Sequence, residues 1–190
     1  MNLSDQVRRL SFRDAAAADI NVTDRILEIR CEAEVRRNMY TDHVITREEH
    51  QRFLERLRAS DDYKLYAVLD GGDVVGAASF YALNVAHRRA DWAFYLTADA
   101  QGHGLGSALE FAFLDKVFAE QPIDKLNCEV IDFNTAVVKL HKRFGFVEEG
   151  VRRNHVRRDG ATYGAVLLGI TREEWSASRG VLTQRLFAGL

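Results

Sequence analysis

Three glycines and a glutamine recur at short spacing in Gln101-Gly102-His103-Gly104-Leu105-Gly106. An alternating apolar run precedes this segment and a helical spacing follows it, so its backbone amides should lie at a helix N-terminus, where they bind anions. An ordinary tight turn is the alternative. A triphosphate P-loop requires a lysine that is missing after Gly106, and a dinucleotide fingerprint requires a glycine where Leu109 stands. The segment therefore predicts an anion site of another kind.

Composition excludes several broad classes of protein. The chain has 190 residues, of which 26 are Lys or Arg and 28 are Asp or Glu, for a net charge of −2, and 47% are hydrophobic. This near-neutral balance argues against a general nucleic-acid binder, and the apolar content argues against disorder. The length suits one domain.

The two cysteines, Cys31 and Cys128, cannot form a disulfide framework and do not cluster with histidines at zinc spacing, so no metal is expected. The first eighteen residues contain no continuous apolar stretch typical of a secretory signal, and no run approaches a membrane span. We therefore expect a cytoplasmic protein with reduced thiols, without a membrane or nucleic-acid partner.

The positioning elements are predicted from periodicity and turn residues. Thr46 and Glu49 form a capping box at the start of one helix, and Asn134 and Gly145 are placed to begin and end another. The predicted strands are Leu10–Arg13, Tyr63–Leu69, Val74–Tyr81, Asp91–Thr97, Leu126–Ile131, Phe146–Val151 and Thr162–Ile170, and the helical segments are Ala16–Met39, Ile45–Ser60, one from Leu105 and one from Asn134. This order indicates an α/β protein with a mixed sheet and helices on both faces.

Two separate motifs resemble one family. Gln101, Gly104 and Gly106 fit the Gln-x-x-Gly-x-Gly loop that holds the acetyl-CoA pyrophosphate in the GNAT N-acetyltransferase superfamily. A second cofactor-side motif of that family is similar to Asn134, Ala136, Leu140 and Phe144-Gly145-Phe146. The resemblance covers about Leu10 to Ile170. It implies a GNAT domain over residues 1–171. The tail 172–190 starts like a helix, and we expect it to be part of the same domain.

The resemblance also implies the reaction. A primary amine attacks acetyl-CoA, the co-substrate, directly in a ternary complex, while the backbone amide of Leu96 stabilises the oxyanion between two strands that splay apart. The residues that the family pattern assigns to the cofactor are Leu96, Gln101, Gly102, His103, Gly104, Leu105, Gly106, Ser107 and Asn134.

Proton transfer requires an acid for the leaving thiolate and a base for the ammonium group. His141 stands where the family often has a catalytic Tyr, so we predict it as the acid, with simple packing as the alternative. Glu129 is the candidate base and Asp91 its rival, although a water chain serves in many members. Leu96, His141 and Glu129 thus make up the predicted catalytic set.

The run Val35–His43, with His50 and Phe53, resembles the N-acetyltransferases of the pseudaminic-acid pathway. Those enzymes acetylate the 4-amino group of a UDP-linked 4-amino-4,6-dideoxy-N-acetylhexosamine. Gly164 differs from the pattern of that group, in which an Asp is expected at this position. The predicted substrate-binding residues are Arg30, Met39, Tyr40, His50 and Phe53.

Other functions stay open on the sequence alone. A protein N-terminus, as in ribosomal-protein acetyltransferases, or a polyamine would be an alternative acceptor, although Arg30, Arg36 and Arg37 disfavour a polyamine. A non-catalytic acetyl-CoA-binding module on the same fold is a third hypothesis. Pairing of sheet edges into a homodimer is common in the family, so the resemblance allows that assembly.

Overall fold

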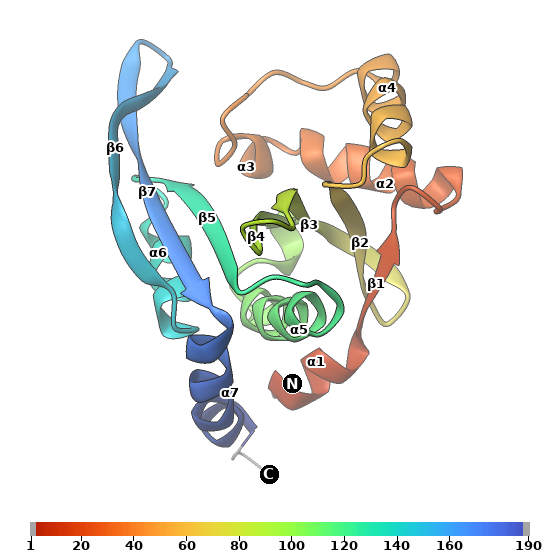
Figure 1. Cartoon of the computed structure of the whole chain (residues 1–190). Helices are drawn as coiled ribbons and strands as arrows, with labels where there is room; N and C mark the ends of the chain where they lie inside the picture. Colours follow the sequence, from red (N-terminus) through yellow and green to blue (C-terminus); the bar gives the residue numbers. More distant parts are fainter. Residues whose placement is uncertain (1–2, 188–190) are drawn as a thin grey trace.

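The computed structural model describes residues 3–187, in which seven strands form one mixed sheet in the order β1-β2-β3-β4-β5-β7-β6 (Figure 1). The predicted mixed sheet with flanking helices is confirmed. The strands are β1 (Leu10–Asp14), β2 (Lys64–Asp70), β3 (Asp73–Asn84), β4 (Arg89–Leu96), β5 (Lys125–Ile131), β6 (Val147–Arg158) and β7 (Ala161–Thr171). The helices are α1 (Leu3–Arg9), α2 (Ile20–Cys31), α3 (Ala33–Arg36), α4 (Arg47–Arg58), the 3-10 turn η1 (Ala98–Ala100), α5 (Leu105–Glu120), α6 (Thr135–Arg143) and α7 (Arg172–Phe187).

Both faces of the sheet are buried because successive side chains of a strand point to opposite sides. On β2, Tyr66 and Val68 join the larger core with α5, whereas Leu65 and Ala67 join a smaller core with α2 and α4. Figure 1 shows α2, α3 and α4 on one side of the sheet and α1 and α5 on the other. A residue's place in the alternation therefore decides which side of the sheet its side chain reaches.

The predicted helix boundaries are confirmed where a local signal exists. Thr46 and Glu49 form the reciprocal capping box of α4, and the Asn134 side chain accepts a hydrogen bond from the Val137 amide at the start of α6. Gly145 follows α6 with a φ of 101°, a left-handed conformation that glycine adopts without strain.

The helical pattern over Ala16–Met39 is interrupted at Glu32, where we predicted no break. Glu32 has a ψ of 137° and separates α2 from α3. Its carboxylate accepts hydrogen bonds from the Thr97 hydroxyl at 2.7 Å and the Ala98 amide at 2.8 Å. These two hydrogen bonds compensate for the helical hydrogen bonds that are lost at Glu32. They also fix α3 beside the end of β4.

The strand splay that the resemblance implies is present between β4 and β5. These parallel strands pair only at Arg89↔Lys125, Ala90↔Leu126 and Asp91↔Asn127. Beyond this point the edges separate, which leaves backbone groups of β4 available for a ligand.

Both ends of the described chain are helical. The periodicity had not predicted α1, and it indicated only the start of α7. Residues of α1 pack against the larger core, and α7 buries Trp175, whose indole donates to Asp115 at 3.1 Å. Strand β6 also extends seven residues beyond its predicted end at Val151. Among the described residues, no helix is long and apolar enough to cross a membrane.

Candidate active site

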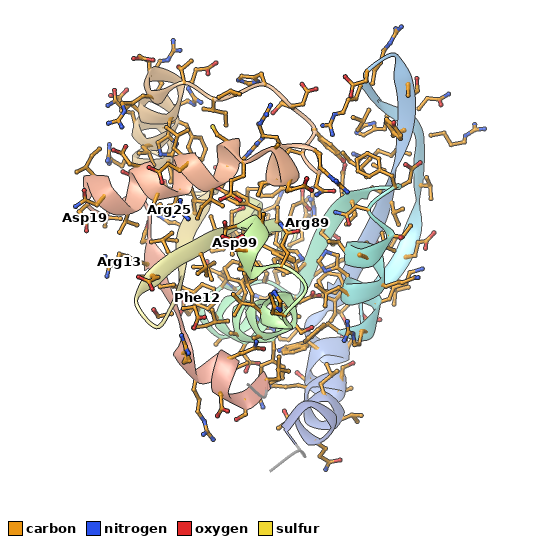
Figure 2. All side chains as sticks on the ribbon, turned by 180° about the vertical axis from the view of Figure 1, so that it is seen from behind. Phe12, Arg13, Asp19, Arg25, Arg89 and Asp99 are labelled. Atoms are coloured by element: carbon orange, nitrogen blue, oxygen red, sulfur yellow. The ribbon has the colours of Figure 1, made fainter. Side chains whose placement is uncertain are left out.

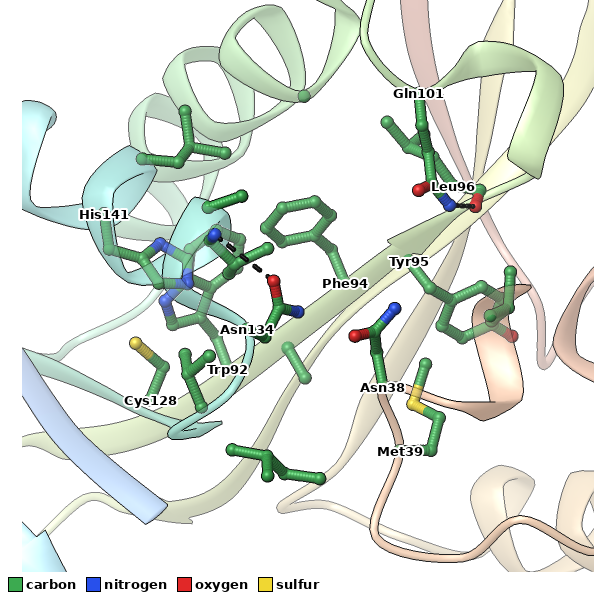
Figure 3. Close-up of a pocket in the computed structure, with 18 of the residues that line it drawn as sticks. Asn38, Met39, Trp92, Phe94, Tyr95, Leu96, Gln101, Cys128, Asn134 and His141 are labelled. Carbon is green, nitrogen blue, oxygen red and sulfur yellow. Dashed lines mark hydrogen bonds between the residues drawn. The ribbon is translucent and has the colours of Figure 1, made fainter. Parts of the chain in front are cut away.

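A cavity of about 690 Å³ opens where β4 and β5 separate, and its walls come from both faces of the sheet (Figure 3). Cys128 of β5 belongs to the core on the α5 side, and the alternation places the next residue, Glu129, on the side of α2 and α3. The cavity therefore connects the two faces through the gap, so two substrates can approach from opposite sides and meet between the strands.

The glycine segment forms the rim on the α5 side. Gly102, Gly104 and Gly106 line the cavity with Gln101 and Ser107, and Gly104 caps α5 with a φ of 87°. The first amides of a helix have no intrahelical acceptor and are available to an anion. His103 and Leu105 do not line this cavity: the His103 carbonyl accepts from Gln6, and Leu105 is buried in the core.

The end of β4 presents the predicted oxyanion donor. The Thr97 amide donates to the Val75 carbonyl of β3 at 2.8 Å, so the preceding amide, that of Leu96, faces the gap toward β5. The Leu96 carbonyl lies on the same edge and accepts from Gln101 Nε2 at 2.9 Å (Figure 3). Gln101 thus fixes the glycine segment to the strand end that would face a thioester.

His141 lies deep in the cavity wall, only 3% exposed, on the α5 side. Its Nδ1 is 2.8 Å from Oε1 of Glu110, a fully buried carboxylate on α5. Burial opposes the charged ring, but the charge of Glu110 and the hydrogen bonds with Glu110 and the Cys128 sulfur outweigh it and raise the pKa of His141 to about 10. The imidazole is therefore protonated at neutral pH and can supply a proton.

Glu129 lies on the opposite side of the gap and is already engaged. One carboxylate oxygen accepts from Arg152, the other accepts from the Tyr40 hydroxyl at 2.7 Å, and His155 lies 3.9 Å away. Burial and the contact with Glu129 raise the pKa of Tyr40. The rival base, Asp91, accepts from Asn127 at the paired end of the strands.

The segment between α3 and α4 is held across this side of the cavity by Arg158 of β6. Its guanidinium donates to the carbonyls of Arg37 and Met39, and the side chain is only 9% exposed. Met39 and Tyr40, two predicted substrate residues, line the cavity in consequence. Arg158, on the last hairpin, thus positions this segment of the chain.

Arg30 also lines the cavity, whereas His50 and Phe53 do not. His50 is buried and donates to the Thr23 carbonyl at 2.9 Å, and Phe53 packs edge-on against Tyr63. Both belong to the packing between α4 and the sheet, so we withdraw them as substrate residues. Their helical spacing fitted a buried face as well as a binding face.

Residues 9–147 match the family model described as the acetyltransferase (GNAT) domain. The chain belongs to the GNAT acetyltransferase family. It is an N-acetyltransferase that uses acetyl-CoA as its co-substrate, as predicted. The splayed strands and the glycine segment at the start of α5 suit that co-substrate, because they offer backbone donors beside a cavity.

A curated relative is the SPbeta prophage-derived uncharacterized N-acetyltransferase YokL of Bacillus subtilis, 27% identical over 90% of this chain and 94% of its own length. Among solved structures, the fold resembles spermidine N-acetyltransferase from Vibrio cholerae with CoA and spermine (TM-score 0.82, 18% identity, 89% of this chain and 99% of that one). It also resembles the ribosomal L7/L12 acetyltransferase RimL with CoA (TM-score 0.74, 18% identity, 86% and 94%).

Proposed function

We propose that this N-acetyltransferase acts on an amine whose carrier also bears an anionic group, and that the carrier is a UDP-linked 4-amino-4,6-dideoxy-hexosamine. The observation that carries the proposal is Arg30. Its Nη1 is buried in the cavity wall and has no hydrogen-bond partner among the described residues, while Nη2 lies 3.3 Å from the Thr41 hydroxyl. An unpartnered buried guanidinium donor is costly unless a ligand oxygen meets it.

The charge balance supports an anionic acceptor over a polyamine. Among the described residues that line the cavity, Glu129 is the one carboxylate, and Arg152 already pairs with it. A polyamine would need several free carboxylates to pair its ammonium groups. A diphosphate oxygen would instead meet the unpartnered Nη1 of Arg30, because guanidinium groups are common partners of phosphate in proteins.

The proposed chemistry assigns one task to each catalytic residue. The amine nitrogen forms a bond to the acetyl carbon, and the Leu96 amide stabilises the oxyanion. The bond from carbon to sulfur then breaks, and the His141 imidazolium gives its proton to the thiolate. Before the attack, Glu129 receives one proton of the substrate ammonium once the substrate displaces Tyr40, and the second proton that the nitrogen loses as the amide forms passes to solvent. Gln101, Gly102, Gly104, Gly106, Ser107 and Asn134 are the proposed cofactor-binding residues.

The test is acetyl-CoA turnover, measured by release of free thiol. The acceptors are a UDP-4-amino-4,6-dideoxy sugar, the same sugar without UDP, peptides with free N-termini, and spermidine. We expect the nucleotide sugar to have the highest kcat/KM. Turnover on peptides alone would assign the RimL-like alternative, and turnover on spermidine alone would contradict the charge argument. Tight acetyl-CoA binding without turnover on any amine would contradict catalysis on these acceptors.

Substitution of Arg30 tests the contact itself. Arg30→Met should raise the KM for the nucleotide sugar at least tenfold, with little effect on the KM for acetyl-CoA. Arg25→Met is the matched control, because Arg25 is an exposed residue of the same helix (Figure 2). Its guanidinium pairs with Glu28. Equal effects of the two substitutions on the sugar KM would refute the assignment of Arg30.

A further inference from the structure

A carboxylate that no family motif marks lies directly behind the proposed acid. Glu110 is on α5, one helical turn after Gly106, so it is on the same face of the helix as the rim of the cavity. It is 0% exposed, and its Oε1 is 2.8 Å from His141 Nδ1. The helix that presents the glycine segment therefore also carries the partner of His141.

Stabilisation of the fold does not by itself explain why Glu110 and His141 form a buried pair. Two buried charges lose their hydration, and a well-packed apolar pair of similar volume is commonly at least as stable. In the described part of the chain, the second oxygen of Glu110 has no hydrogen-bond partner. A buried polar group left half satisfied adds a further cost and requires an explanation.

The surroundings of the ring show what the carboxylate controls. The titratable groups that face the His141 ring are Glu110 from α5 and the Cys128 thiol from β5. Burial raises the pKa of Cys128, so this group stays a neutral thiol at physiological pH. Glu110 is therefore the one full negative charge that faces the ring among the described residues.

The remaining contacts of the ring are aromatic. Trp92 lies 5.3 Å from the imidazole between ring centroids, Phe94 lies 6.0 Å away and Phe146 5.1 Å away. These rings exclude water and bring no counter-charge. Without the charge of Glu110, burial would favour the neutral imidazole, which cannot protonate a leaving thiolate as readily.

We propose that Glu110 is a positioning residue for acetyl transfer, because its carboxylate holds the His141 imidazole doubly protonated and oriented toward the cavity. This inference rests on the proposed function, since it assigns a partner to the acid of that reaction. The proton that His141 gives to the thiolate is replaced from solvent after the products leave. Glu110 touches no substrate.

The first experiment compares the wild type with Glu110→Gln, which keeps the size of the side chain and removes its charge. At pH 7 we expect kcat to fall at least tenfold while the KM for acetyl-CoA stays within threefold. The alkaline limb of kcat should move from near pH 10 to below neutral pH, so lowering the pH restores activity. Glu120→Gln, on the exposed side of α5 and paired with Lys116, is the control.

A structural role would lower the Tm without moving the pH profile, and that result would overturn the proposal. A second readout is independent of turnover: a titration of the His141 ring nitrogens by NMR in selectively labelled protein. The ring should be doubly protonated at pH 7 in the wild type and neutral in Glu110→Gln. A neutral ring in the wild type would refute the proposal even where Glu110→Gln does not fold. Doubly protonated His141 in an enzyme that acetylates no amine would support the pair and refute only the proposed function.

Discussion

The contact of Arg158 with the segment 37–46 makes a quantitative prediction about acceptor binding. The guanidinium donates to the carbonyls of Arg37 and Met39, which hold Tyr40 at the cavity. A hydrogen bond from a charged donor contributes about 1.5–3 kcal/mol, and the released carbonyls regain part of this from water. Loss of both bonds in Arg158→Ala should therefore cost roughly 2–3 kcal/mol. At ~1.4 kcal/mol per factor of ten, kcat/KM for the amine should fall about 30- to 140-fold.

The assay is steady-state acetyl transfer with each substrate varied in turn. The loss should appear in the amine KM, and the KM for acetyl-CoA should stay within threefold, because the glycine segment lies on the other face of the sheet. Arg157→Ala, at the exposed neighbouring position, is the control and should behave like the wild type. An unchanged amine KM in Arg158→Ala, or an equal loss of acetyl-CoA affinity, would refute this role of the segment.

Two further predictions concern stability. Gly164→Ala should lower the free energy of unfolding by about 1–3 kcal/mol, because an added Cβ would lie 2.8 Å from Oδ2 of Asp132 and 3.1 Å from a backbone carbonyl; a thermal melt as high as that of the wild type would contradict the clash. Burial lowers the pKa of His50, so the unfolded chain binds a proton more readily below about pH 6.5 and stability falls as the pH drops. His50→Gln should flatten this acid loss in a series of melts from pH 7.5 to pH 5, and an equally steep loss would show that other groups cause it.

The parts of the fold that the sequence predicted are those with a local signal. The capping box at Thr46, the Asn134 cap and the Gly145 termination each depend on residues within one helical turn. The break at Glu32 was not predictable in this way, because its cause is a contact with Thr97, 65 residues away. The full length of β6 likewise depends on pairing with β7.

The residues of the site divide in the same way, into those that a local motif predicts and those that depend on contacts between distant parts of the chain. The glycine segment and the position of His141 could be assigned by spacing, since both belong to motifs of the family. Glu110 could not, because 31 residues separate it from His141 and its helical pattern shows only one polar residue on an apolar face. His50 is the opposite case. The sequence predicts it as a substrate residue, but it lies on the apolar face of its helix and donates to the Thr23 carbonyl. A buried polar residue is thus assigned by its partner, which the sequence alone does not reveal.

Charge at the acceptor side illustrates why composition is a weak guide to a partner. The chain has a net charge of −2, yet Arg30, Arg36 and Arg158 all donate hydrogen bonds to residues 37–42. Arg152 is paired with Glu129, and Arg158 is bonded to backbone carbonyls, so neither offers its full set of donors to a ligand. Arg30 keeps a buried nitrogen without a partner in the described structure. The acceptor that the site can bind therefore depends on which hydrogen-bond donors the fold leaves without a partner. A single buried donor discriminates between acceptors more strongly than several exposed charges, because water screens the exposed ones.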